Sequence, residues 1–549
     1  MREGLSKRGW WLLIFAVAII WFSNLEYRLL VKPDEGRYAE IPREMVASGD
    51  WVTPRLNNLK YFEKPPLQYW ATAVAYEAFG EHQWTSRLWA ALTGFLGLLL
   101  TWYTGMRLFG RTAASYATLL LGSSLLFVGM AHINTLDMGV TFFVTLGLFA
   151  LMLAQRNPYS VPQRRGWMLL AWAAMALAVL SKGLMGIILP GTALFIYIAI
   201  QREWALLKRL HLVSGLLLFL AICAPWFYLV MKANPEFFQR FFIYEHYTRF
   251  TTKDLGRYQP WYYFVPILIL GAMPWTLLMF DTLLRTWRDS VCSVRDFNPE
   301  RFLLVWIVFV YVFFSVSGSK LPSYLLPMFP PMALLMGQRL ATIEPERLFR
   351  LLLPILALAG VAVSLAPMMA KLADYPEQAA LYAAYARWVE GAALIWLAAM
   401  LIGSLLLRRG SKFAAVLVIS LGSLLAYQVV LSGYNAAARE RNGIHIAETI
   451  RPLIKPEMPL YQVWTYEQTI PFYLKRTFTL VQYQDEMAFG IQQEPERWIP
   501  TIEQFAPIWR DQSEALAIMP IYTYPMLQKL ELPMKVVYQD YQFVVVSRK

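Results

Sequence analysis

The feature of this sequence that most limits its fold is a series of long apolar runs. Runs of about 16 to 23 residues, long enough to cross a bilayer as a helix, predict about thirteen spans. The spans lie near residues 10–24, 86–108, 113–131, 134–154, 166–181, 183–200, 211–231, 262–284, 301–316, 323–340, 350–370, 388–407 and 413–433. With 57% hydrophobic and 16% charged residues among 549, the composition excludes a soluble protein of this size. The sequence therefore predicts an α-helical integral membrane protein.

The net charge of +13 reports topology rather than nucleic-acid binding, because the sequence contains no basic soluble domain with interleaved aromatic residues. Lysine and arginine concentrate in alternate connections, as the positive-inside rule requires of cytoplasmic loops. These connections are the N-terminal tail and residues 107–111, 156–165, 202–209, 285–301, 339–350 and 408–412. The other connections are therefore expected to face outward, and they carry nearly all of the chemically interesting residues.

The first outward connection, about residues 25–85, is long and predicts two helices. The first begins near Asp34 and stops at Gly49, with charged residues opposite apolar ones, which is typical of a helix in the membrane interface. The second begins at Pro65-Pro66 and ends at Gly80. A third interfacial helix is expected from Asn234-Pro235 toward Phe250.

From about residue 435 the apolar spans cease and short elements alternate. Residues 444–454 and 502–510 predict helices. Extended segments are predicted at 460–464, 477–482, 515–520, 536–538 and 542–546. We therefore expect a transmembrane domain over residues 1–434 and a C-terminal α/β domain over residues 435–549 outside the membrane.

Asp34 and its neighbour Glu35 are the most distinctive acidic pair. A structural interpretation is that Asp34 only caps the helix that follows. The functional interpretation gains weight from Asp137, Lys182 and Lys320, which lie in short turns at span ends. Charged groups there are costly unless paired or solvated, and they commonly mark substrate pathways.

Four cations, Lys64, Lys182, Arg249 and Lys320, lie on the face where few are expected. Together they indicate an anion site, and in a membrane the anion would be a lipid phosphate. The alternative is that each side chain extends to the interface without a ligand. Tyr324 likewise suits either this site or an aromatic belt at the membrane surface.

Glu63 and His246 are the candidates for a divalent metal such as zinc, although a single histidine is commonly a hydrogen-bonded structural residue. No glycine-rich phosphate loop or nucleophile elbow is present, so no nucleotide cofactor is expected. A transferase on the outer face would need a sugar donor already anchored in lipid.

Several motifs together resemble the bacterial lipid A aminoarabinose transferases. More broadly, they are similar to the GT-C superfamily that includes the dolichyl-phosphate-mannose protein mannosyltransferases. The resemblance covers about residues 10–340 and departs at Gly36, where the family pattern has threonine. The motifs are Pro33-Asp34-Glu35-x-Arg37-Tyr38-Ala39-Glu40-Ile41, Ser48-Gly49-Asp50-Trp51, Tyr61-Phe62-Glu63-Lys64-Pro65-Pro66, Leu136-Asp137, Ser181-Lys182-Gly183, Glu245-His246-x-x-Arg249-Phe250 and Lys320-Leu321-Pro322-Ser323-Tyr324.

The resemblance implies a GT-C fold and transfer of 4-amino-4-deoxy-L-arabinose from undecaprenyl phosphate to lipid A phosphates. The reaction would take place at the periplasmic face of the bacterial inner membrane and would give polymyxin resistance. The enzyme is expected to act as a monomer. Asp34 and Asp137 match acidic positions at the catalytic centre, and Glu63 with His246 would be the metal pair. The residues expected to bind the carrier phosphate or substrate are Arg37, Lys64, Lys182, Arg249, Lys320 and Tyr324.

Two other functions remain open from the sequence. A sibling enzyme with the same kind of donor would glycosylate a protein or another envelope glycan. A lipid or sugar transporter would show internal repeats and charges near the middle of the bilayer. The charges here cluster at one face instead, which favours a transferase.

Overall fold

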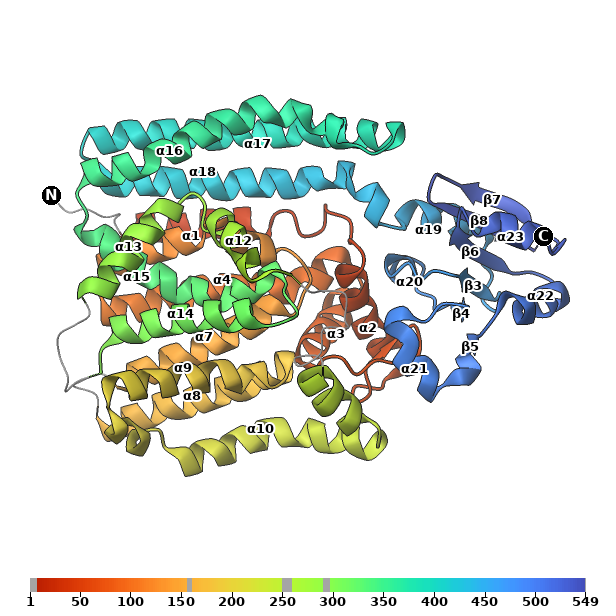
Figure 1. Ribbon diagram of the computed structural model, residues 1–549, viewed down its shortest axis with the longest axis horizontal. Coiled ribbons are helices and arrows are strands. Elements are labelled where there is room, and N and C mark those ends of the chain that lie inside the picture. The colour runs from red at the N-terminus through yellow and green to blue at the C-terminus, as the bar shows by residue number, and fades with distance from the viewer. Residues whose placement is uncertain (1–6, 156–159, 249–258, 290–296, 549) are drawn as a thin grey trace. The chain divides into compact units, whose positions relative to one another are not determined.

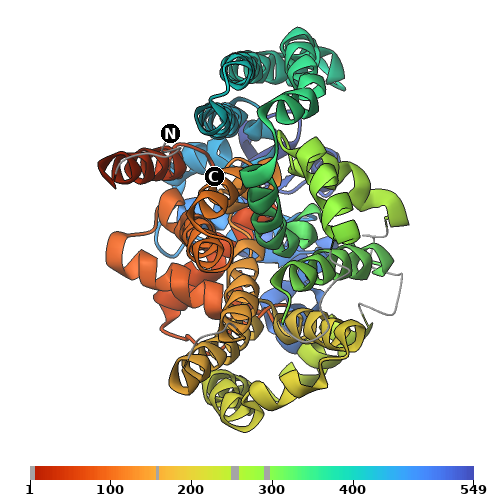
Figure 2. The same ribbon diagram turned by 90° about the vertical axis from the view of Figure 1, so that its left-hand side faces the viewer.

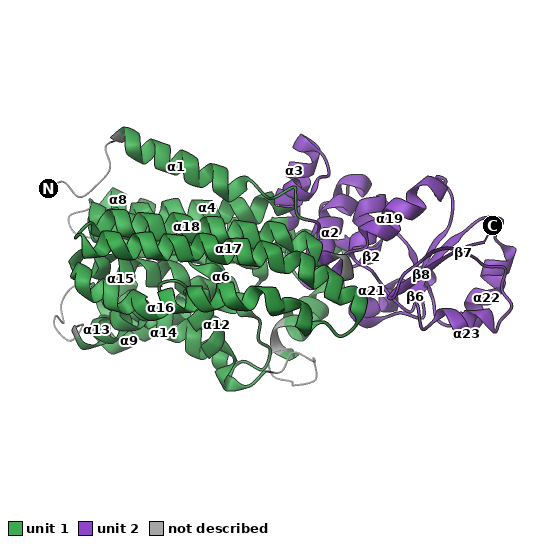
Figure 3. Cartoon of the chain, turned by 90° about the horizontal axis from the view of Figure 1, so that it is seen from above, with its two compact units in different colours: residues 1–28, 64–68, 87–437 green, residues 29–63, 69–86, 438–549 purple. Residues whose placement is uncertain are grey.

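The computed structural model describes residues 7–155, 160–248, 259–289 and 297–548 (Figure 1). The chain forms two compact units, coloured separately in Figure 3. Unit 1 holds residues 1–28, 64–68 and 87–437, and unit 2 holds residues 29–63, 69–86 and 438–549. Unit 2 thus joins most of the first outward connection to the C-terminal segment.

Unit 1 is a bundle whose helices mostly run alongside one another (Figures 1 and 2). In the described part of the chain, seven helices are long and apolar enough to cross a membrane, or nine if each of two bent pairs is one span. The protein is therefore a multi-pass membrane protein, while the predicted count of thirteen spans is not confirmed. The α-helices of this bundle, short ones included, are α1 (Lys7–Phe22), α4 (Gln83–Leu108), α5 (Arg111–Leu121), α6 (Leu125–Ala131), α7 (Asp137–Ala154), α8 (Val161–Lys182), α9 (Met185–Gln201), α10 (Leu212–Ala233), α12 (Phe264–Gly271), α13 (Thr276–Asp289), α14 (Pro299–Val316), α15 (Phe329–Thr342), α16 (Pro345–Leu365), α17 (Pro376–Arg408) and α18 (Lys412–Gly433).

The two bent pairs explain part of the difference in count. Helices α5 and α6 meet at 66°, and the segment 261–271 meets α13 at 114°. At the first break, the hydroxyls of Ser123 and Ser124 donate to helix carbonyls, which ends the helix without leaving polar groups unsatisfied. At the second break Pro274 lacks the amide donor that would continue the helix.

Buried polar side chains fix the chain where α1 ends. The guanidinium of Arg87, which has no exposed surface, donates to the carbonyls of Leu25, at 2.8 Å, and Arg28. Arg28 in turn donates to the carbonyl of His132. The imidazole of His132 contacts the Trp21 carbonyl and the Gln428 amide, each within 2.8 Å. These bonds tie α1 to α4, α6 and α18 inside unit 1.

The two helices predicted in the first outward connection are confirmed as α2 (Asp34–Ser48) and α3 (Leu67–Phe79). Gly49 ends α2 with φ of 71°, the left-handed conformation that glycine adopts without strain. Residues 35–45 of α2 are all buried, so its charged side chains lie inside the protein. The location of this helix in the membrane interface stays a prediction.

The charged side chains of α2 are stable in this buried position because they have partners within unit 2. Arg43 forms two bonds to Glu40, at 2.7 and 2.6 Å. Glu44 accepts from the backbone amides of Asn57 and Asn58, at 2.5 and 2.7 Å, between the short strands β1 (Arg55–Leu56) and β2 (Leu59–Lys60). Buried carboxylates require such partners.

The C-terminal segment forms a six-stranded mixed sheet in the order β5-β4-β3-β6-β8-β7. Strand β3 pairs in parallel with both β4 and β6, and β8 runs antiparallel to β6 and β7. The predicted α/β character is confirmed. The elements are α19 (Ile444–Ile450), β3 (Leu460–Val463), α20 (Thr469–Leu474), β4 (Thr479–Val481), α21 (Ala488–Gln493), β5 (Trp498–Ile499), α22 (Ile502–Asp511), β6 (Leu516–Pro520), α23 (Tyr524–Gln528), β7 (Lys535–Gln539) and β8 (Phe543–Ser547).

Apolar residues cover both faces of this sheet. Alternate side chains of β3, such as Leu460 and Tyr461, enter opposite cores, as the two-residue period of a strand requires. Helix α22 packs on one face through Phe505, and α19 and α20 contribute to the core on the other. The unit is thus a doubly wound sheet.

Candidate functional site

Asp34 and Arg37 form the centre of the candidate site in unit 2. Asp34 is the first residue of α2, where its charge suits the helix dipole. Its side chain is 46% exposed, and the N-cap position before it is occupied by Pro33. Its nearest cation is the guanidinium of Arg37, at 3.6 Å. Asp34 is therefore an accessible carboxylate next to a buried arginine.

Arg37 is held by an ion pair with Glu486, from the segment before α21. Its guanidinium also lies 5.8 Å from the ring centres of Tyr38 and Tyr61. Burial alone lowers the pKa of Arg37, but Tyr61, Glu486 and Tyr38 hold that pKa above its ordinary value. Arg37 is therefore a permanent cation.

The tyrosines around Arg37 supply hydroxyl donors. Burial raises the pKa of Tyr38, Tyr61 and Tyr69, so their hydroxyls stay protonated. Within the described ranges, the hydroxyls of Tyr61 and Tyr69 and the Nε of Arg37 are buried without a hydrogen-bond partner. Buried donors of this kind are unusual in a folded protein and are commonly explained by a ligand or water.

Gly36 allows α2 to approach the start of α20. A Cβ atom at this position would lie 2.7 Å from the backbone carbon and oxygen of Gln468. The threonine that the resemblance predicts at this position would press its Cβ against this backbone, whereas glycine fits.

In unit 1, Asp137, Lys182 and Tyr324 lie together. The sequence assigns all three residues to one candidate site. Asp137 begins α7, Lys182 ends α8, and the two side chains form an ion pair. The ammonium of Lys182 lies 4.9 Å from the ring centre of Tyr324, in the 3₁₀ turn Pro322–Met328. The Asp137 carboxylate compensates the charge of Lys182.

Lys64 approaches the buried carboxylate of Glu245, a residue of one of the motifs above to which the sequence assigned no role. Its ammonium is 3.7 Å from Glu245, whose other oxygen is 3.2 Å from Arg240. Glu245 and Arg240 belong to a π-helix, Gln239–Thr248, rather than to the predicted α-helix. The five-residue hydrogen-bond spacing of a π-helix brings such residues to one side.

Lys320 is buried and donates to two backbone carbonyls, those of Gln259, at 2.8 Å, and Ser317, at 2.5 Å. It therefore holds together the connection between α14 and the turn that carries Tyr324. Arg249 and the side chain of His246 lie outside the described residues.

No group of three or more metal-ligating side chains occurs where the structure describes them. The pairing of Glu63 with His246 stays a prediction, because the His246 side chain is not among those described.

Comparison with known proteins decides the family. An "Aminoarabinose transferase C-terminal domain" model matches residues 446–548, and a "Dolichyl-phosphate-mannose-protein mannosyltransferase" model matches residues 63–229. A crystal structure of ArnT from Cupriavidus metallidurans bound to undecaprenyl phosphate is 40% identical, with a TM-score of 0.93 and 99% of both chains covered. The chain belongs to the ArnT family of aminoarabinose transferases. The predicted family and GT-C fold are thereby confirmed.

Two further matches show the similarity of the chain to another arabinosyl transferase and to a more distant protein of the same fold. An undecaprenyl phosphate-alpha-4-amino-4-deoxy-L-arabinose arabinosyl transferase from Edwardsiella ictaluri is 33% identical over 371 residues, which span 65% of this chain and 66% of the relative. An archaeal oligosaccharyltransferase from Archaeoglobus fulgidus is 11% identical with a TM-score of 0.51, over 94% of this chain and 70% of that chain. The second match shows a shared fold alone.

Proposed function

We propose that this ArnT-family protein transfers 4-amino-4-deoxy-L-arabinose from undecaprenyl phosphate to a phosphate group of lipid A. The observation that carries the proposal is the near-complete match to an ArnT structure that holds undecaprenyl phosphate. The relatives' names supply the sugar. The acceptor, lipid A, is supported by the family resemblance of the motifs around Asp34 and Lys64.

The reaction breaks the bond between the sugar C1 and the carrier phosphate through an oxocarbenium-like state. Negative charge builds on the departing phosphate oxygen, so nearby cations accelerate the step. Lys64 is the best candidate of the described cations, since the single negative charge of Glu245 is divided between Lys64 and Arg240. Arg249, close to Glu245 in the chain, is proposed to assist.

Asp34 has two possible roles in this reaction. A hydroxyl acceptor would require it as general base. A lipid A phosphate is already an anion near neutral pH, so proton removal contributes little. We therefore assign Asp34 mainly to binding the cationic amino group of the donor sugar, which its exposed carboxylate suits. The donors on Tyr61, Tyr69 and Arg37 are suited to the sugar hydroxyls.

The active site is proposed to face the periplasm, on the grounds of the basic alternate loops. The relevant membrane is then the bacterial inner membrane, and the protein is proposed to act as a monomer. Modification of lipid A with a cationic sugar lowers its negative charge, which would give resistance to polymyxin.

The test is mass spectrometry of lipid A from a strain that makes the lipid-linked amino-sugar but lacks its own transferase. Complementation with wild type is expected to add the mass of one or more aminoarabinose groups, and the Asp34→Asn variant is not. Unmodified lipid A despite well-expressed wild-type protein would contradict the proposed acceptor. It would favour a protein or another envelope glycan as the acceptor of the same donor.

A further inference from the structure

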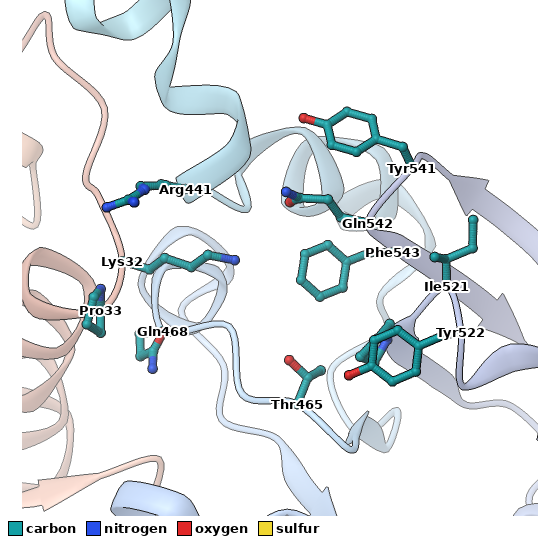
Figure 4. A pocket seen from close by; sticks show the side chains of 11 residues that line it. Lys32, Pro33, Arg441, Thr465, Gln468, Ile521, Tyr522, Tyr541, Gln542 and Phe543 are labelled. Carbon is teal, nitrogen blue, oxygen red and sulfur yellow. The ribbon is translucent and has the colours of Figure 1, made fainter. Parts of the chain in front are cut away.

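A cavity lies within unit 2, outside the groups assigned above. Its volume is about 680 Å³, within the usual range for small-molecule sites. Figure 4 shows the side chains around it, which come from the residues before α2, from Arg441 before α19, from the loop after β3, from the end of β6 and the turn after it, and from the β7–β8 hairpin.

The position of this cavity in the sheet is the one that favours ligand binding. From β3 the chain winds outward to β4 and β5, then crosses to β6 on the other side of β3. The strand order therefore reverses between β3 and β6. Thr465 follows the carboxyl end of β3, and Ile521 and Tyr522 follow that of β6. Ligands of open α/β sheets bind at this switch point.

The lining combines positive charge with aromatic rings. The charged residues that line the cavity in the described part of the chain are Lys32 and Arg441, both basic. The Lys32 ammonium lies 5.1 Å from the ring centre of Phe543 and 2.6 Å from the carboxylate of Glu467, which is 1% exposed. Arg441 and Tyr522 are exposed. Aromatic faces pack against sugar rings, while arginine binds phosphate.

The cavity adjoins the group formed by Asp34, Arg37 and Glu486 through two connections. Pro33, one of its lining residues, immediately precedes Asp34. Gln468, another, donates at 2.6 Å to Glu486, the partner of Arg37. A molecule in the cavity would therefore lie beside the start of α2.

The geometry points to a binding site for a phosphorylated saccharide, which we assign to the acceptor headgroup; this assignment rests on the proposed function. The charge of the lining favours the acceptor over the donor. Lys32 is paired with Glu467, so Arg441 is the charged lining residue that a phosphate would meet. The phosphate of the donor is offset by the cationic amino group of its sugar, whereas a lipid A phosphate is attracted by its full negative charge.

Direct binding tests the site without catalysis. The probe is glucosamine 1-phosphate, titrated into the full-length protein in detergent by calorimetry. Arg441→Gln and Tyr522→Ala are each expected to raise Kd about tenfold, the effect of losing one good contact. Both residues are exposed, so the fold should tolerate the changes. Lys529→Gln removes an exposed charge of the same unit away from the cavity and is the control.

Two outcomes of the titration would overturn the assignment. One is an unchanged Kd in both variants. The other is binding of inorganic phosphate as tight as that of glucosamine 1-phosphate, which would reduce the site to a simple anion site.

Transfer kinetics identify which substrate uses the site. In Arg441→Gln, KM for lipid A should rise about tenfold while KM for the undecaprenyl-linked donor stays unchanged. A rise in the donor KM alone would overturn the assignment to the acceptor. If wild type transfers nothing to lipid A, the proposed function fails, but glucosamine 1-phosphate binding that Arg441→Gln abolishes would still support the saccharide site.

Discussion

Replacing Glu486 with glutamine leaves the buried charge of Arg37 without its main partner. The substitution keeps the side-chain size and lets the amide of Gln468 still donate to residue 486. Arg37 is buried, and its remaining ion-pair partner, Asp34, is 3.6 Å away and half exposed to water, while Glu63 adds a smaller attraction. The variant therefore probes one buried ion pair with little change in shape.

The expected cost follows from the burial of the pair. Removing one partner of a buried ion pair costs about 3–5 kcal/mol. The remaining attraction to Asp34 is weakened by solvent, so we expect Glu486→Gln to lower the free energy of unfolding of unit 2 by about 2–4 kcal/mol. Replacing Arg37 with methionine as well removes the stranded charge, and the double variant should regain most of that loss.

Hydrogen exchange, measured by mass spectrometry on the full-length protein, reports this loss of stability for individual strands. A loss of about 3 kcal/mol corresponds to exchange about a hundredfold faster in β4 and β3, where opening of unit 2 limits exchange. Glu457→Gln, an exposed acid of the same unit, is the control and should leave exchange unchanged. A coupling energy between Arg37 and Glu486 below about 0.5 kcal/mol would refute the buried-pair argument.

Three further predictions concern single contacts. Lys64→Ala should weaken undecaprenyl phosphate binding about tenfold while Arg240 keeps Glu245 paired, and an unchanged affinity would contradict the role of Lys64. Gly36→Thr should cost about 1–3 kcal/mol through overpacking against Gln468, and an unchanged Tm would show that the backbone there yields freely. Asp137→Asn should reduce transfer more than the double variant Asp137→Asn with Lys182→Met, because the single change strands a cation; equal losses would argue against the ion pair as the important feature.

The fold was largely predictable where local pattern decides it. Gly49 marks the end of helix α2 in the sequence, and short apolar runs mark the strands of the C-terminal domain. The burial of the α2 charges was not predictable. Glu44 is paired with backbone amides thirteen and fourteen residues away, and nothing in the local sequence encodes that approach.

The candidate site was predictable only where a motif carried it. Asp34, Lys64, Asp137 and Lys182 stand in recognisable motifs, and the structure gives each a charged partner. Glu486 was missed because the C-terminal domain shows no catalytic motif. Arg240 was missed because α-helical spacing was assumed for a segment that forms a π-helix. Partners supplied by distant segments carry no sequence signal of their own.

The cations assigned to phosphate are nearly all compensated within the protein. Lys182 faces Asp137, Arg37 faces Glu486, Lys64 shares Glu245, and Lys320 binds carbonyls. A buried cation without compensation would be costly before the donor arrives. Compensation keeps them in place, and it also limits how tightly they bind a phosphate. Undecaprenyl phosphate is the product that must leave after each transfer, so moderate affinity favours turnover. Neutralising Glu245 with glutamine should therefore tighten undecaprenyl phosphate binding and slow its release, and weaker binding in that variant would show that the carboxylate serves to position Lys64 instead.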